Sequence, residues 1–235
     1  MLLELEWGPQ GIQACPQADL YVIFDVLSFS SCVDIAIGCG ATILPFAYRD
    51  ERAAAFAMAQ QAMLASERGA PGYSLSPASL LQLQPGSRLV LPSPNGATLS
   101  LLAQSKPVLS VCLRNAAAAA AWIQAQDFEL IQLVPAGERW PDGSLRPAIE
   151  DWLGAGALAA RLKGDFSPEA EMAAVSYLAG LGRLPELIRT CPSGQELIQR
   201  GFGEDVELAV QADVSPAVPG FADGAYTDWR EHAPF

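Results

Sequence analysis

The chain contains a single histidine, His232, which lies near its carboxyl end. Histidine-dependent chemistry would therefore require the carboxyl-terminal tail to fold back into a site, and neither a Ser-His-Asp triad nor a His-rich zinc centre is expected. A metal-independent hydrolase with a Ser or Cys nucleophile would lack a well-placed base. The sequence thus argues against the histidine-based classes of hydrolase.

The sequence contains few cysteines, and their spacing matches no common disulfide or metal-binding motif. No two of the five form a Cys-x-x-Cys pair: they are Cys15, Cys32, Cys39, Cys112 and Cys191. An odd number without such a pair fits neither a disulfide framework nor a zinc ribbon. We expect reduced, mostly buried thiols and no disulfide bond, and we interpret Cys32, in an apolar helix, as a core residue rather than a nucleophile.

Basic residues are scarce, since 14 Lys and Arg stand against 26 Asp and Glu and give a net charge of −12. Such a surface repels phosphate backbones and anionic membranes, so nucleic-acid or membrane binding is not expected. No apolar run approaches the roughly 18 residues of a membrane span, and the first residues lack the basic segment of a signal peptide. We expect a cytoplasmic protein.

The composition is that of a well-buried domain, because hydrophobic residues make up 51% of the 235 positions and charged residues 17%. Apolar runs that favour strands alternate with segments that favour helices. The predicted strands are 21–24, 42–46, 88–91, 108–113 and 130–135, and the predicted helices are 30–36, 51–64, 98–103, 116–124 and 149–162. This alternation is typical of a layered α/β/α fold with a parallel or mixed sheet.

The last third of the chain is predicted to be largely helical. Ser167 is an N-cap candidate before Pro168, and Ser193 opens a further helix. The tail 214–235 is rich in Pro, Gly and Asp and is expected to be loop-like. We expect one domain over 1–235, and a division into two intertwined halves of about 1–106 and 107–213 remains open.

Ligands of open α/β sheets bind beyond the carboxyl ends of the strands, so polar residues directly after strands are the candidate site. Asp25 follows the first predicted strand and precedes Ser28, Ser30 and Ser31 at a helix start, where hydroxyl and backbone N–H groups suit an oxyanion. The alternative is a simple helix cap. A buried carboxylate without a partner or metal is costly, which favours a functional Asp25.

The other strand ends carry complementary groups. Ser93, Asn95 and Gly96 form a turn that can present amides to a phosphate, and Arg114 before Asn115 offers a bidentate fork for an anion. A charged loop then runs through Glu138, Arg139, Asp142 and Arg146 to Glu150 and Asp151. The alternative for the Asn95-Gly96 segment is a plain turn, and the alternative for Arg114 is a surface ion pair. The charged loop could instead be a solvated loop without function. Hard oxygen donors of this kind suit Mg²⁺ and metal-assisted chemistry on a phosphate.

These motifs resemble the 2-phosphosulfolactate phosphatase (ComB-like) family across most of the chain. The matching elements are Asp25-Val26-Leu27, Glu67-Arg68-Gly69, Asn95-Gly96, Asn115-Ala116, Ala136-Gly137, Glu150-Asp151, Ala155-Gly156, Ser193-Gly194, Gly201 and Asp205-Val206. The resemblance implies a ComB-like α/β fold and a Mg²⁺-dependent phosphatase, with Glu67 and Arg68 closing the site.

The chain departs from this family at two positions. Family members typically carry arginines where this sequence has Ser28 and Thr98. Because an arginine in an anion site discriminates the anion that it binds, this difference bears on the substrate more than on the scaffold. Arg114, Arg139 and Arg146 are the candidates to replace the two missing arginines.

The leading hypothesis is a Mg²⁺-dependent hydrolase of a small anionic phosphomonoester, either 2-phosphosulfolactate or a related phosphorylated acid. A non-catalytic anion-binding protein on the same scaffold is the alternative, and a homo-oligomer remains open. The catalytic candidates are Asp25 and Asn95, and the metal candidates are Asp25, Glu150 and Asp151. The substrate-binding candidates are Ser30, Ser31, Arg68, Ser93, Gly96, Arg114, Asn115 and Arg146.

Overall fold

The computed structural model describes residues 1–231, so His232 lies outside the described residues. The strands are β1 (Leu2–Leu5), β2 (Leu20–Phe24), β3 (Thr42–Phe46), β4 (Met63–Leu64), β5 (Arg88–Pro92), β6 (Val108–Ser110), β7 (Leu130–Pro135), β8 (Glu138–Arg139), β9 (Leu145–Arg146), β10 (Asp165–Phe166), β11 (Pro219–Ala222) and β12 (Ala225–Asp228). The α-helices are α1 (Gly8–Ala14), α2 (Phe29–Gly38), α3 (Glu51–Ala59), α4 (Pro77–Leu80), α5 (Gly96–Leu102), α6 (Ala116–Gln124), α7 (Ile149–Ala159), α8 (Pro168–Gly180), α9 (Leu184–Thr190), α10 (Pro192–Gln199) and α11 (Gly203–Ala209). Short 3₁₀ turns cover Leu113–Asn115 and Leu181–Arg183.

Within the described residues, ten strands form one mixed sheet in the order β10-β1-β7-β2-β6-β11-β12-β3-β5-β4, and β8 pairs with β9 separately. The strands β10, β1, β7, β2 and β6 are parallel to one another, and so are β3, β5 and β4. The hairpin of β11 and β12 joins the two groups through antiparallel pairs with β6 and β3. The expected layered α/β/α fold with a mixed sheet is confirmed.

The alternation of side chains along β2 explains why helices cover both faces of the sheet. Leu20, Val22 and Phe24 belong to a core with apolar residues of α6, α7 and α8. Tyr21 and Ile23 point to the opposite face and belong to a second core with residues of α2 and α5. Since every residue of β2 is buried, the strand is a continuous apolar run, as is typical of a strand covered on both faces.

The curvature of the sheet brings its two groups of strands together at the site. Three successive antiparallel pairs make β3 and β5 run opposite to β2, so in a flat sheet their carboxyl ends would lie at opposite edges. Helix α5, which follows β5, nevertheless contacts both β2 and β3. Sheets twist from strand to strand, and here the twist turns the ends of β2 and β5 toward each other.

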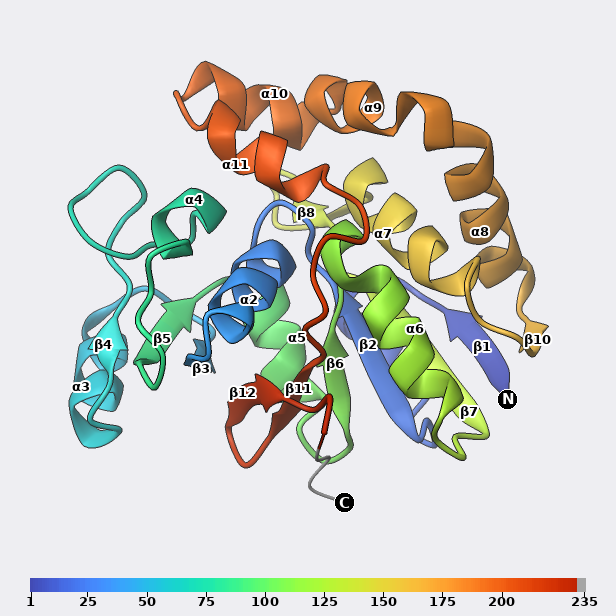
Figure 1. Ribbon diagram of the computed structural model, residues 1–235, viewed down its shortest axis with the longest axis horizontal. Helices are drawn as coiled ribbons and strands as arrows, with labels where there is room; N and C mark the ends of the chain where they lie inside the picture. Colours follow the sequence, from blue (N-terminus) through green and yellow to red (C-terminus); the bar gives the residue numbers. More distant parts are fainter. Residues whose placement is uncertain (232–235) are drawn as a thin grey trace.

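Helices α8 to α11 form an arc across the top of the view in Figure 1, above the β8 hairpin and the carboxyl end of the central strands. Ser167 accepts a hydrogen bond from the amide of Ala170 and Pro168 begins α8, so this predicted helix start is confirmed. Helix α10 instead begins at Pro192, with the sulfur of Cys191 accepting from the amide of Gly194 at 3.3 Å. The N-cap is therefore Cys191 and not Ser193.

Two further expectations about local structure were wrong. The tail is not loop-like throughout, because 219–222 and 225–228 form the hairpin that completes the sheet. Pro219 is the first residue of β11, where a missing amide is tolerated, and Gly220 leaves room for the ring of Trp229, so neither residue prevents the strand. The helix expected over 51–64 ends at Ala59, where the backbone turns and Met63–Leu64 becomes the edge strand β4. The division into two halves stays a prediction.

All five cysteines are free thiols, four of them buried, in agreement with the expectation of no disulfide bond. None of the helices within residues 1–231 is both long enough and apolar enough to cross a membrane.

Candidate functional site

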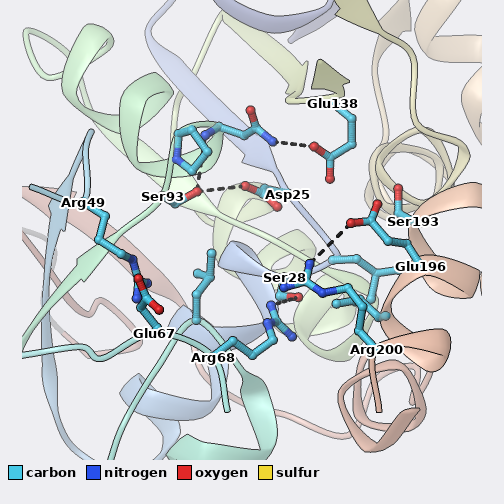
Figure 2. Close-up of a pocket in the computed structure, with 15 residues that line it drawn as sticks. Asp25, Ser28, Arg49, Glu67, Arg68, Ser93, Glu138, Ser193, Glu196 and Arg200 are labelled. Atoms are coloured by element: carbon cyan, nitrogen blue, oxygen red, sulfur yellow. Dashed lines mark hydrogen bonds and ion pairs between the residues drawn. The ribbon is translucent and has the colours of Figure 1, made fainter. Parts of the chain in front are cut away.

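A pocket of about 540 Å³ lies where the ends of β2 and β5 meet the β8 hairpin and α10. Figure 2 shows Asp25 near its centre, Glu138 on one side and arginine side chains on the other. The lining residues are Asp25, Leu27, Ser28, Arg49, Glu67, Arg68, Leu75, Ser93, Pro94, Asn95, Glu138, Ser193, Glu196, Leu197 and Arg200.

Asp25 follows β2 directly and is held by groups from both sides of the sheet. Its Oδ1 accepts from the amide of Phe29 at 3.2 Å, and its Oδ2 accepts from the amide of Gly96 at 2.7 Å and from the hydroxyl of Ser93 at 3.4 Å. Burial raises the pKa of Asp25, and the charge of Glu150 raises it further, whereas the amide donors oppose this shift. The carboxylate is thus fixed in place but electrostatically unfavourable without a cation nearby.

The turn after β5 places Ser93, Asn95 and Gly96 against Asp25. A Cβ at Gly96 would collide with the ring of Phe29 and lie 2.9 Å from Oδ2 of Asp25, so the close approach requires glycine. Asn95 donates through Nδ2 to Oε2 of Glu138 at 3.0 Å. The structure therefore brings together the predicted residues Asp25, Ser93, Asn95 and Gly96.

Glu138 is a pocket residue to which sequence reasoning assigned no specific role. It begins β8, directly after the Ala136-Gly137 turn that follows β7. Burial, followed by repulsion from Asp25, raises the pKa of Glu138 to about 7. The available signal is its position three residues beyond the end of the buried strand β7, in a loop that the sequence indicates only as charged.

Glu150 and Asp151 lie in the first turn of α7 and are both buried. Asp151 accepts from the amide of Val26 at 2.7 Å and from the amide of Gly137 at 2.9 Å, so each of its oxygens already has a backbone donor. It ties the loop after β2 to the loop after β7. Oε2 of Glu150 is buried and has no hydrogen-bond partner among the described residues.

The opposite side of the pocket carries positive charge. Arg68 forms an ion pair with the buried Asp205 and donates to the hydroxyl of Ser28 at 3.0 Å. Arg49 and Arg200 line the same pocket from the loop after β3 and the end of α10. Of these three arginines, only Arg68 was a predicted substrate-binding residue. Arg49 lies three residues after β3, a strand end that the sequence predicts but that was not considered part of the site. Arg200 follows a helix, so the strand-end rule could not identify it.

Several predicted substrate-binding residues support the site from outside the pocket. The Ser30 hydroxyl accepts from the amide of Asp25 at 3.0 Å, and the Ser31 hydroxyl donates to the carbonyl of Val26 at 2.8 Å. The Asn115 side chain accepts from the amide of Cys112 at 2.9 Å. Arg146 donates to the hydroxyl of Ser193, a lining residue, at 3.4 Å. These side chains satisfy buried backbone groups or position a lining residue.

Arg114, a predicted substrate-binding residue, does not line the pocket. Its Nε donates to Oδ2 of Asp34 at 2.8 Å, and its Nη1 donates to the carbonyl of Leu208 at 2.9 Å and to Gln211 at 2.8 Å. Asp34 is fully buried in α2, and a buried carboxylate needs a charged partner. Arg114 supplies that partner and joins α2 to the end of α11.

The comparisons with known proteins agree with this arrangement. Residues 8–224 match the model of the 2-phosphosulpholactate phosphatase family. The chain belongs to this family. Its matched segment contains every pocket residue described above, from Asp25 to Arg200.

Individual relatives show the same extent of similarity. A probable 2-phosphosulfolactate phosphatase of Gloeobacter violaceus is 29% identical over 225 residues, which cover 91% of each chain. One from Parasynechococcus marenigrum is 32% identical over 213 residues, covering 84% of this chain and 86% of the relative. The 2-phosphosulfolactate phosphatase of Methanothermobacter thermautotrophicus is 28% identical over 220 residues, covering 92% and 90% respectively.

Proposed function

We propose that this protein is a phosphomonoester hydrolase that acts on 2-phosphosulfolactate or a related small phosphorylated acid, with Mg²⁺ as its cofactor. Membership of the family and the names of its relatives support the reaction. The observation that carries the proposal for this chain is one pocket in which Asp25 and Glu138 face the arginines Arg49, Arg68 and Arg200. A substrate with several negative charges needs such arginines, and metal-assisted phosphate chemistry needs such carboxylates.

Some lining residues would bind the substrate and others would orient it. Asp25 is fixed by its three donors at the end of β2 and faces the pocket, and Asn95 and Glu138 are held together at the same end. Ser93 and Asn95 line the pocket with a hydroxyl and a side-chain amide that can donate to a phosphate. Arg68, fixed by Asp205, contributes positive charge that offsets the negative charge of the substrate.

The donor set fits Mg²⁺, which in phosphate sites is bound by one or two carboxylates together with phosphate oxygens and water. Asp25 and Glu138 would hold it, because both line the pocket and both have raised pKa values that a cation would lower. Glu150, with its unpartnered oxygen, is buried, and its charge helps to raise the pKa of both Asp25 and Glu138, whereas Asp151 already accepts from two amides. Among residues 1–231, no three His, Cys, Asp or Glu side chains form a metal site by themselves, so substrate oxygens would complete it. When bound, Mg²⁺ would neutralise phosphate oxygens.

One sequence observation favours a second candidate function. Ser28 and Thr98 stand where family members typically carry arginines, so the anion site differs from that of the family. A chain that keeps the pocket but binds its anion without turnover would show the same geometry. This alternative differs from the proposal in a single measurable property, the release of phosphate.

The test is a phosphate-release assay on purified protein with 2-phosphosulfolactate and 2-phospholactate, in Mg²⁺ and in excess chelator. We expect release from at least one substrate in Mg²⁺ and loss of release in chelator. The thermal unfolding temperature should also rise when Mg²⁺ is added to wild type, and rise less in Asp25→Asn. Binding of either compound without phosphate release would favour the non-catalytic alternative, and release that survives complete chelation would contradict the role of Mg²⁺.

A further inference from the structure

Two arginines of the pocket are gathered at one aromatic ring. The guanidinium carbon of Arg68 lies 5.3 Å from the ring centroid of Phe202, and that of Arg200 lies 5.7 Å from the same centroid. Both side chains line the pocket (Figure 2), yet they come from segments more than a hundred positions apart in sequence. Two guanidinium groups held close at one ring can both bind an anion that lies between or beside them.

The environment of Arg68 fixes its position. Its partner Asp205 is nearly inaccessible to solvent and also accepts from the hydroxyl of Ser76 at 2.6 Å and from the amide of Ala78 at 3.1 Å. The remaining Nη group donates to the hydroxyl of Ser28 at 3.0 Å. Arg68 is therefore a rigid element of the pocket wall, with its charge already offset by one carboxylate.

Arg200 is held far more weakly. Its only ion pair among the described residues is with Glu196, one turn earlier in α10, at 3.3 Å, and the two side chains are 56% and 63% exposed. Exposed pairs at this spacing contribute little to stability, so a ligand anion can replace Glu196 at small cost. Figure 2 shows the Arg200 guanidinium directed toward the middle of the pocket, beside Ser28.

We propose that Arg68 and Arg200, gathered at Phe202, form a second anion subsite that binds the acid group of the substrate, a carboxylate or a sulfonate, while its phosphate lies at Asp25. Arg200 is then a residue that determines specificity. This inference rests on the proposed function for the position of the phosphate. The subsite would make simple alkyl phosphates poor substrates, because they carry no second negative group.

The opposing charge of Glu196 gives the subsite a second testable property. In the absence of ligand, Glu196 forms an ion pair with the Arg200 guanidinium. Glu196 also lines the pocket, so its negative charge repels the acid group of an incoming substrate. Its removal should therefore strengthen binding, whereas removal of Arg200 should weaken it. A merely structural role for the ion pair would instead make both changes act in the same direction.

The first experiment compares kcat/KM of wild type and Arg200→Gln on three compounds: 2-phosphosulfolactate, 2-phospholactate, which lacks the sulfonate, and isopropyl phosphate, which lacks both acid groups. We expect a loss of roughly tenfold or more where the acid group is present, the range for hydrogen bonds to a charged group, and less than twofold for isopropyl phosphate. A loss of kcat/KM on 2-phosphosulfolactate alone would identify the sulfonate as the group that Arg200 binds. A loss on both 2-phosphosulfolactate and 2-phospholactate would identify the carboxylate. Equal losses on all three compounds, or none, would overturn the subsite.

The second experiment measures binding of sulfolactate, which lacks the phosphate, by calorimetry at fixed low salt. Arg200→Gln should weaken this binding roughly tenfold. Glu196→Gln should tighten it by up to about fivefold, the range for an exposed pair, and the double variant should show no such gain. The matched controls are Arg183→Gln and Glu186→Gln, an exposed ion pair outside the pocket, which should leave binding unchanged.

The two experiments separate failure of the subsite from failure of the proposed function. If wild type releases no phosphate but binds sulfolactate in an Arg200-dependent manner, the subsite stands and the hydrolase does not. If wild type hydrolyses 2-phosphosulfolactate but Arg200→Gln changes neither its specificity nor sulfolactate binding, the hydrolase stands and the subsite is wrong. Absence of both phosphate release and sulfolactate binding in wild type would overturn both.

Discussion

The amide of Gly96 donates to Oδ2 of Asp25 at 2.7 Å, and this hydrogen bond joins the start of α5 to the end of β2. The two residues are 71 positions apart and belong to groups of strands that run in opposite directions. Their contact links the two groups of strands at the site. It makes the position of the carboxylate depend on the packing of α5 as much as on β2.

Gly96→Ala should therefore damage both the fold and the site. The added Cβ would collide with the ring of Phe29 and crowd Oδ2 of Asp25, so α5 or the carboxylate must shift. We expect a loss of about 1 to 3 kcal/mol in the free energy of unfolding, as is typical of overpacking, together with reduced phosphate release. The control is Gly182→Ala, where the added Cβ would have no neighbour within 4 Å. Equal stability of the two variants in urea unfolding would contradict this geometry.

Arg114→Ala should destabilise the protein without weakening the anion site. The substitution leaves Asp34 buried without its charged partner, and breaking a buried pair in this way costs about 3 to 5 kcal/mol. Calorimetry with inorganic phosphate, below the unfolding temperature of the variant, should give the same affinity as wild type. A weakened affinity in a folded Arg114→Ala variant would show that this arginine reaches the ligand after all.

The raised pKa of Glu138 gives the stability a defined dependence on pH. Because the pKa rises from 4.5 to about 7 on folding, the folded state binds this proton more tightly than the unfolded state. Its contribution to stability is complete below the unfolded pKa of 4.5 and is lost as the pH rises through about 7. Glu138→Gln removes this titration and keeps an acceptor for Asn95.

We therefore expect Glu138→Gln to gain stability relative to wild type as the pH is raised from acid to slightly alkaline, measured in chelator by thermal unfolding. Mg²⁺ should reduce the difference at the higher pH, because a bound cation stabilises the charged carboxylate. A constant difference between the two proteins across this range would contradict the raised pKa.

The thiols should differ sharply in reactivity. Cys39 is partly exposed, whereas the other four are buried, and burial raises the pKa of Cys112 and Cys191 to about 12. Because the thiolate is the reactive form, a thiol reagent should modify Cys39 first and the remaining thiols only on unfolding. Cys39→Ser should abolish the early reaction. Rapid native modification of a second cysteine would show that a buried core segment opens.

The central strands and the main candidate carboxylate could be predicted from the sequence because local signals agree there. The buried run of β2, the acid that ends it and the Asn95-Gly96 turn are all encoded within a few neighbouring residues. Glu138, Asn95 and Asp25 could be placed at strand ends by the same rule. The resemblance to the family added their order along the chain.

Apart from Arg68, the arginine side of the pocket was not predicted, because it depends on how the sheet curves. Arg49 and Arg200 reach the pocket only once the β11–β12 hairpin has joined the two groups of strands, and this hairpin lies in a segment whose Pro and Gly content indicated loop. Arg114 shows the converse: its position after a strand indicated a ligand, but the buried Asp34 that it neutralises gave no local signal. Local sequence patterns do not show which charged residues form ion pairs in the folded protein.

The measurement that tests the central claim most directly is kcat/KM of Asp25→Asn on 2-phosphosulfolactate in Mg²⁺, with cooperative unfolding of the variant verified beforehand. Asn keeps the size and one acceptor for the surrounding donors, but it removes the charge at the end of β2. We expect a loss of at least about a hundredfold, the scale for a group that acts on the charge of the transition state, while Arg183→Gln retains wild-type activity. A folded Asp25→Asn variant with wild-type kcat/KM would show that the pocket between β2 and β5 is not the site of phosphate hydrolysis.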